Sequence, residues 1–294
     1  MDSEQSRRGT PQPEILPPGA VPIGGGPSQP RGWYPPPPAP QVRRPRHWAS
    51  APATYTLVGI NFAVYLFTLW QSQSISGPLF YENSLSAKLL LNGAWVFRLG
   101  EWWRVFTAMF VHFGWIHIGA NMWCLWNLGL LGEPLLGEFG MIAAYVLTGA
   151  VGNLVSIAIH PGAPGQGGYL SAGASGAVFG IAGVLLMLLR SPLLPIPQFE
   201  LKKLRRSVWY FALLNFVVDA GIWAAHTRLQ IDNMAHLGGF VGGILFGLPL
   251  LPRIGAPRDR FLRRRMLVVV GSAFVLVLFA WWLHAVYPPI GSSS

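Results

Sequence analysis

The sequence predicts an all-α polytopic membrane protein, and three of its properties support this fold class. Of its 294 residues, 52% are hydrophobic and only 11% are charged, whereas a soluble domain carries roughly 25% charged residues. Apolar segments that reach the length of a membrane-spanning helix, about 20 residues, recur along the chain. The 13 tryptophans fit the aromatic belts of a membrane protein. This composition places most of the chain in lipid.

The chain divides into three predicted parts. Residues 1–48 are rich in proline and glycine, so they lack the apolar surface that offsets ordering entropy, and we expect a disordered cytoplasmic tail. Residues 49–252 hold six predicted spans, and residues 253–294 hold a basic cytoplasmic loop, a seventh transmembrane helix and a short tail. The expected spans are 53–71, 104–131, 140–160, 175–190, 208–225, 232–251 and 265–286.

Lysine and arginine predict the orientation of these spans. With a cytoplasmic N-terminus, the cytoplasmic segments hold six basic residues before the first span, five around residues 190–206 and six between Arg253 and Arg265, which is 17 of 21. The positive-inside rule therefore places the N-terminus in the cytoplasm and, with seven spans, the C-terminus outside the cell membrane. This placement accounts for the formal charge of +10 without a nucleic-acid partner. The arginine-rich, lysine-poor composition favours a bacterial inner membrane.

Polar side chains occur in three of the predicted spans at a similar depth. The second span carries His112, His117 and Asn121, Ser175 begins the fourth span, and His236 lies near the start of the sixth. In the predicted orientation, all of them lie in the outer part of the membrane. Ionisable groups inside spans are costly and by default indicate function.

Glycines at helical spacing predict a close approach of the fourth and sixth spans. Small residues at such spacing allow membrane helices to approach closely. This approach would bring Ser175 within hydrogen-bond distance of His236. The glycines on these faces are Gly176, Gly180 and Gly183 in the fourth span and Gly239, Gly243 and Gly247 in the sixth.

The residue types at this depth suit nucleophilic catalysis. A serine hydroxyl is a weak nucleophile until a base takes its proton, and His236 is the available base for Ser175. Backbone N–H groups at the start of a helix lack partners and favour negative charge. The side chains of His117 and Asn121 add possible donors to an oxyanion.

No metal or cofactor is expected at this site. Asp219 and Asp232 are candidates for a third catalytic residue, but a Ser–His dyad is the simpler interpretation. Residues five apart on a helix point about 140° away from each other, so His112 and His117 are not expected to bind one metal ion together. The lone Cys124 excludes an intrachain disulfide and a multi-cysteine metal site.

The sequence that contains these serine, histidine, asparagine and glycine residues resembles the rhomboid intramembrane serine proteases. The resemblance covers about residues 50–252 and implies a six-helix rhomboid bundle around a water-filled cavity, here followed by a C-terminal seventh transmembrane helix. It rests on four motifs in the family's order and spacing. The motifs are "EWWR" (Glu101–Arg104), "HFGWIHIGAN" (His112–Asn121), "GASGAVFG" (Gly173–Gly180) and "AHLGGFVGG" (Ala235–Gly243).

The resemblance also implies a role for each matching residue. Ser175 would be the nucleophile and His236 the general base, with His117 and Asn121 serving the oxyanion. The supporting residues that it implies are His112, with a structural role or a place at the water-filled cavity, Trp103 and Arg104 in the first outer loop (residues 72–103 and the start of the second span), Gly173 and Gly176 around the serine, and Glu133 as a structural residue in the cytoplasmic turn after the second span.

The implied function is that of an intramembrane serine endopeptidase. Its substrates would be membrane proteins whose transmembrane segments are cut in or near the outer part of the bilayer. An alternative is a catalytically inactive relative that binds membrane proteins for trafficking or degradation, although such relatives typically lose the serine or the histidine. A transporter would show an internal repeat with broken helices in matching positions, and none is found.

Overall fold

A computed structural model describes residues 51–72, 86–162, 169–224, 231–253 and 257–288. Within these ranges the chain is helical apart from connecting segments and one isolated bridge. The predicted tail at residues 1–48 lies outside the described residues. The longer helices are α1 (Pro52–Ser72), α4 (Trp115–Leu136), α5 (Glu138–Ile159), α6 (Ser175–Leu188), α7 (Gln198–Ala224), α8 (Asn233–Gly247) and α9 (Arg258–Val286).

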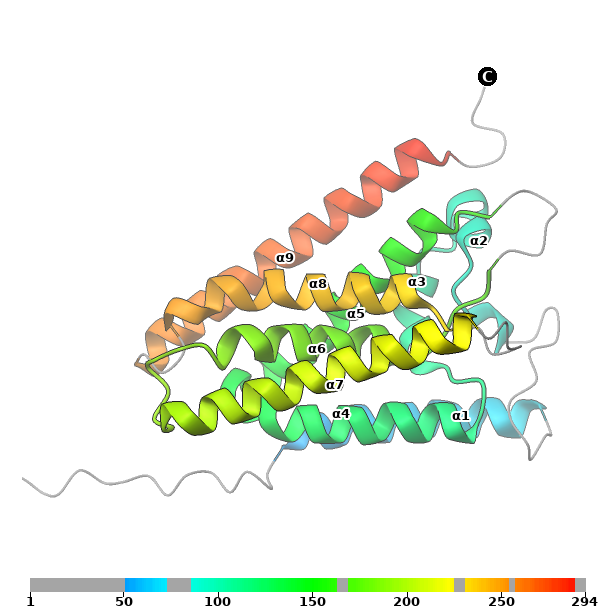
Figure 1. The fold of residues 1–294 in the computed structure, drawn as a ribbon. Helices are drawn as coiled ribbons and strands as arrows, with labels where there is room; N and C mark the ends of the chain where they lie inside the picture. Colours follow the sequence, from blue (N-terminus) through cyan, green and yellow to red (C-terminus); the bar gives the residue numbers. More distant parts are fainter. Residues whose placement is uncertain (1–50, 73–85, 163–168, 225–230, 254–256, 289–294) are drawn as a thin grey trace, which may run out of the picture. The chain divides into compact units, whose positions relative to one another are not determined.

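Each of the seven predicted spans overlaps one of these helices. By length and composition, α1, α5, α9 and the run from α8 into the 3₁₀ helix η3 (Leu248–Arg253) can each cross a membrane. Helix α6 is apolar but shorter. It lies between α5, α7 and α8 in Figure 1 and contacts all three as well as α4. Every residue of α6 after Ser175 is buried, so α6 is the core of the bundle.

The second span is not one continuous helix, which corrects the expectation for residues 104–131. The structure has a short helix α3 (Arg104–Thr107), a 3₁₀ turn η2 (Ala108–Phe110) and an extended segment before α4. Gly114, with φ −178° and ψ 171°, is the N-cap of α4. An N-cap residue is extended, so the helix begins only at Trp115.

Two other helices begin earlier than expected. Helix α7 starts at Gln198 and not at 208, and α9 starts at Arg258 and not at 265. The basic residues expected in the preceding loops form the first turns of both helices, because lysine and arginine are good helix formers. A proline directly precedes each helix: Pro257 is the N-cap of α9, and the carbonyl of Pro197 accepts the first backbone bond of α7.

Glu133 connects α4 to the start of α1. Its carboxylate accepts the N–H groups of Ala53 at 3.0 Å and Thr54 at 2.7 Å, together with the Thr54 hydroxyl at 2.7 Å. These N–H groups lack helical partners, and the positive end of the helix dipole favours the negative charge. The residue lies inside the last turns of α4, which corrects its expected position in the turn after that helix.

Helix α9 is attached to the other helices at both of its ends. Near its start, Arg265 Nη1 donates to the carbonyl of Leu136 at 2.5 Å. At its end, the Tyr287 hydroxyl donates to the carbonyl of Ala158 at 3.3 Å, and the Tyr287 ring stacks on Phe97 with centroids 4.8 Å apart. Phe97 belongs to α2 (Gly93–Leu99), so α9 also contacts the segment between α1 and α3.

Candidate active site

The structure brings Ser175 and His236 together. Ser175 is the first residue of α6, and His236 lies in the first turn of α8. The distance between Ser175 Oγ and His236 Nε2 is 2.7 Å. The two side chains, 61 residues apart in sequence, therefore form a hydrogen bond at the same end of neighbouring helices.

Glycine contacts between α6 and α8 make this distance possible. A Cβ atom at Gly239 would collide with the carbonyl oxygen of Gly176, and one at Gly243 would collide with that of Gly180. A Cβ at Gly183 would meet the carbonyl oxygen of Phe240. The two backbones are in direct contact, as the spacing of small residues predicts.

Phe179 covers the imidazole of His236, a contact that the sequence analysis missed. The two rings stack with centroids 4.6 Å apart and an interplanar angle of 21°. Phe179 is one helical turn after Ser175, on the same face of α6, so the four-residue spacing was the available signal. The ring is buried and holds the imidazole plane in one orientation.

His117 and Asn121 lie beside the peptide that precedes the serine. Both belong to the first two turns of α4. A Cβ at Gly173 would lie 2.8 Å from His117 Nε2 and 3.8 Å from Asn121 Nδ2. Gly173 has φ +130°, a conformation that favours glycine. The glycine therefore allows both side chains to approach the backbone next to Ser175.

The hydrogen bonds of His117 indicate its tautomer. Its Nδ1 accepts the N–H of Phe113 at 3.4 Å, so a neutral imidazole carries its proton on Nε2. Asn121 Nδ2 donates to the His117 carbonyl at 3.0 Å and keeps a second N–H. Both residues can thus donate a hydrogen bond on the side of Gly173.

His112 lies close to His117, which corrects the spacing argument. His112 precedes α4, in the extended segment, and the two rings are 5.1 Å apart in an edge-to-face arrangement. The helical angle of about 140° therefore does not apply to this pair. His112 Nε2 accepts the N–H of Ala174 at 3.3 Å. In the described part of the chain, no three His, Cys, Asp or Glu side chains gather as a possible metal site.

Backbone pairing fixes the segment that leads into Ser175. Leu91 and Ser171 form an antiparallel bridge with N···O distances of 2.9 and 3.0 Å. The N–H of Gly173 donates to the carbonyl of Ala108 at 2.9 Å. The segment around Leu91 and η2 thereby hold residues 171–173 in place before α6 begins.

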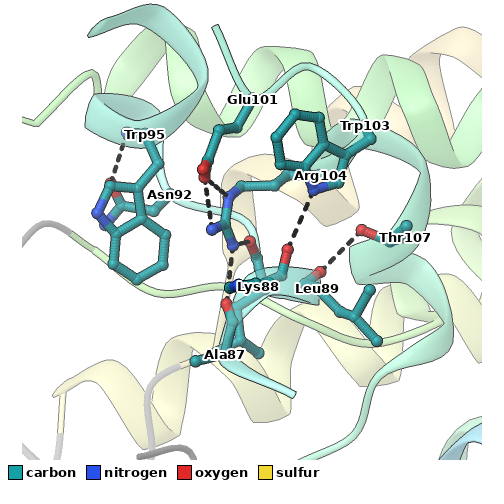
Figure 2. A network of polar contacts seen from close by, with 10 residues as sticks. Ala87, Lys88, Leu89, Asn92, Trp95, Glu101, Trp103, Arg104 and Thr107 are labelled. Atoms are coloured by element: carbon teal, nitrogen blue, oxygen red, sulfur yellow. Dashed lines mark hydrogen bonds and ion pairs between the residues drawn. The ribbon is translucent and has the colours of Figure 1, made fainter. Parts of the chain in front are cut away.

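Arg104 organises the segment of residues 87–107 that precedes η2, as Figure 2 shows. Its side chain is only 4% exposed and lies over the ring of Trp95, with the guanidinium carbon 4.4 Å from the ring centroid. Trp103 Nε1 donates to the carbonyl of Lys88 at 3.2 Å. The acceptors of Arg104 are the Glu101 carboxylate at 2.6 Å and the carbonyls of Ala87 and Leu90, each at 2.8 Å. These bonds satisfy a buried charge.

Asp232 and Asp219 are the two candidates for a third catalytic residue, and only the side chain of Asp232 lies in the described part of the chain. Asp232 is the N-cap of α8, and its carboxylate bonds the Ser156 hydroxyl and the N–H of Ala235. Asp219 lies within α7, and its side chain is outside the described part of the chain. Both oxygens of Asp232 are therefore bonded to groups other than the imidazole.

Comparisons with known proteins show the family to which this chain belongs. A family model described as the Rhomboid domain matches residues 99–253, more than half of the chain. Rhomboid protease GluP from Bacillus subtilis is 31% identical over 195 residues, which are 66% of this chain and 33% of GluP. RHOMBOID-like protein 5 from Arabidopsis thaliana is 32% identical over 154 residues, 52% of this chain and 46% of that protein. Rhomboid protease AarA from Providencia stuartii is 28% identical over 211 residues, 66% of this chain and 71% of AarA.

The chain spans a third of the length of GluP and less than half of RHOMBOID-like protein 5. The family match and the helical structure confirm the predicted fold class, an all-α rhomboid membrane bundle. This chain is a member of the rhomboid family.

Proposed function

We propose that this protein is an intramembrane serine endopeptidase with Ser175 as nucleophile and His236 as general base. The observation that carries the proposal is the 2.7 Å contact between Ser175 Oγ and His236 Nε2. A nucleophile and a base within hydrogen-bond distance are the geometric requirement for serine catalysis. Two relatives, GluP and AarA, are named rhomboid proteases.

In the proposed reaction, Ser175 Oγ attacks the carbonyl carbon of a peptide bond while its proton moves to His236 Nε2. The resulting imidazolium gives this proton to the leaving amine nitrogen, the C–N bond breaks, and an acyl-enzyme remains. A water molecule then attacks the ester carbonyl and loses its proton to His236. Release of the carboxylic acid returns the proton to Ser175.

The proposed oxyanion site combines backbone and side-chain donors. Ser175 begins α6, so the N–H groups of its first turn have no helical acceptors. His117 Nε2 and Asn121 Nδ2 lie on the Gly173 side of the serine. Loss of one such donor typically reduces the rate by about 10²- to 10³-fold.

The proposed substrates are transmembrane segments of other membrane proteins in the same bilayer. With the N-terminus in the cytoplasm, the end of the bundle that carries Ser175 and His236 faces the outer leaflet. The basic first turns of α7 and α9 then lie on the cytoplasmic side, as the positive-inside rule requires. Cleavage would therefore occur in or near the outer part of the membrane.

The experiment that tests this function uses purified protein in liposomes with a single-span model substrate. We expect Ser175→Ala and His236→Ala each to reduce kcat by at least about 10³-fold. The two residues act as one catalytic unit, so the loss of either one removes most of the rate enhancement of both. Ser207→Ala is the matched control, since its hydroxyl lies on the exposed surface of α7 and bonds the Lys203 carbonyl. Equal product from wild type and Ser175→Ala would contradict the proposal. Substrate binding without cleavage by the wild type would favour the inactive-relative alternative.

A further inference from the structure

The glycine contacts bring α8 close to its neighbours but supply no directional bond that sets the position of α8 along its axis. Between α6 and α8, the contacts at Gly239 and Gly243 are between backbones. On the α5 side of α8, valine side chains pack against glycines, and this apolar contact is not directional either. The 2.7 Å distance between Ser175 and His236 requires a more directional contact.

Asp232 provides such a contact at the start of α8. Its Oδ2 accepts the Ser156 hydroxyl at 2.5 Å, and its Oδ1 accepts the N–H of Ala235 at 2.9 Å. The first bond joins α8 to α5, and the second caps the helical turn that contains His236. One carboxylate therefore fixes both the position of the start of α8 relative to α5 and the conformation of the first turn of α8.

The surroundings of this pair favour a fixed geometry. Ser156 is 1% exposed in the last turn of α5. Burial of the Tyr169 hydroxyl, together with the nearby Asp232 carboxylate, raises the pKa of Tyr169, so this neighbour remains a neutral phenol. Hydrogen bonds to an ionised acceptor are roughly twice as strong as those between neutral groups.

We propose that the Ser156–Asp232 hydrogen bond positions His236 opposite Ser175. This inference rests on the proposed function, and it makes Ser156 and Asp232 positioning residues that do not touch the reacting atoms. Without the bond, the start of α8 shifts relative to α6 and the Ser175–His236 distance changes. A displacement of about 1 Å can reduce a catalytic rate by about 10²-fold.

The test compares Ser156→Ala, Asp232→Ala and the double variant in the full-length protein, with Ser207→Ala as the matched control. Three quantities are measured: kcat and KM on the single-span substrate, the labelling rate of Ser175 by a fluorophosphonate, and Tm. We expect each single variant to lower kcat and the labelling rate by about 10- to 100-fold, with KM changed less than about twofold. We expect kcat of the double variant to be no lower than kcat of the slower single variant, because the two single substitutions break the same hydrogen bond.

A conservative variant separates the two bonds of the carboxylate. Asp232→Asn keeps an oxygen for the Ala235 N–H and an amide that can donate to the Ser156 hydroxyl. We therefore expect it to retain more of kcat and of the labelling rate than Asp232→Ala. If Asp232→Ala lowers Tm strongly, the comparison rests on Ser156→Ala, which removes a single hydroxyl.

Two outcomes distinguish this inference from the proposed function. Wild-type kcat and labelling in Ser156→Ala, with Ser175→Ala inactive, would overturn the positioning role and leave the protease intact. A raised KM with unchanged kcat would overturn it as well. Absence of labelling and of cleavage in the wild type would overturn the proposed function itself.

Discussion

Helices α8 and α9 are both apolar and long, yet they contact the rest of the molecule in opposite ways. In an 18-residue apolar stretch of α8 and η3, 56% of the residues are buried, whereas the corresponding share in α9 is 17%. Helix α8 packs along its length against α5 and α6, whereas α9 packs mainly against α5 and η3 and is attached by side chains at its two ends. Apolar composition therefore identifies a span but does not say whether other helices surround it.

Glycine shows the difference between the two helices most directly. On α8, a Cβ at Gly238 would lie 2.7 Å from Val155 Cβ, and one at Gly242 would lie 3.0 Å from a Val151 methyl. On α9, a Cβ at Gly271 would meet nothing within 4 Å. Glycine is therefore required by close contacts with a neighbouring helix in α8, whereas it has open space around it in α9.

The largest predicted effect is that of Gly243→Ala. Its methyl group would overlap the carbonyl oxygen of Gly180, so α8 must move away from α6. We expect a destabilisation of about 3 kcal/mol or more, measured as a lowered Tm in detergent, together with loss of kcat. A wild-type Tm for this variant would show that α8 can shift to accommodate the methyl group.

Removing the attachment at the start of α9 should have a smaller effect. Arg265→Ala loses the bond to the Leu136 carbonyl and the contact with Phe139, whose ring centroid lies 5.5 Å from the guanidinium. We expect a cost of about 1–2 kcal/mol and an unchanged kcat, because the α6–α8 contact is untouched. Arg263→Ala, at an exposed position of the same helix, is the control. A loss of kcat in Arg265→Ala would mean that α9 acts on the catalytic helices.

Tyr287→Phe tests the other end of α9 and should cost less again. The substitution removes the hydroxyl bond to the Ala158 carbonyl and keeps the ring that stacks on Phe97. We expect a destabilisation of about 0.5–1 kcal/mol by thermal unfolding. Tyr287→Ala, which also loses the stacking contact, should be less stable than Tyr287→Phe by about another 1 kcal/mol. Equal stability of the two variants would show that the ring contact contributes nothing.

The smallest predicted effect is that of Gly271→Ala in the middle of α9. The methyl group enters open space, and alanine is a better helix former than glycine by about 1 kcal/mol. We expect Tm to stay the same or rise slightly, with kcat unchanged. A loss of stability as large as that of Gly243→Ala would contradict the difference in glycine packing between α8 and α9.

The sequence could predict the helices and the proximity of Ser175 and His236, because both depend on local patterns. Span length is visible in apolar runs, and close approach is visible in the spacing of Gly176, Gly239 and Gly243. The proximity of His112 and His117 was not predictable from periodicity, since it depends on an extended segment inside a presumed helix.

The partner of Asp232 had no local signal. Asp232 stood out as a carboxylate near His236, but its hydrogen bond to Ser156 joins residues 76 apart, and no pattern along α5 marks Ser156. Helix starts were also misplaced where basic residues continue a helix beyond its apolar part, as at Arg258. Hydropathy reports the solvent around a residue and not the conformation of its backbone.

The capping of α1 by Glu133 has a consequence for biosynthesis. Ala53 and Glu133 are 80 residues apart, so a ribosome completes α1 long before it adds the carboxylate that satisfies the first N–H groups of that helix. The first N–H groups of α1 therefore need water or another acceptor until residue 133 has been added. A ribosome stalled before residue 133 leaves α1 without this cap.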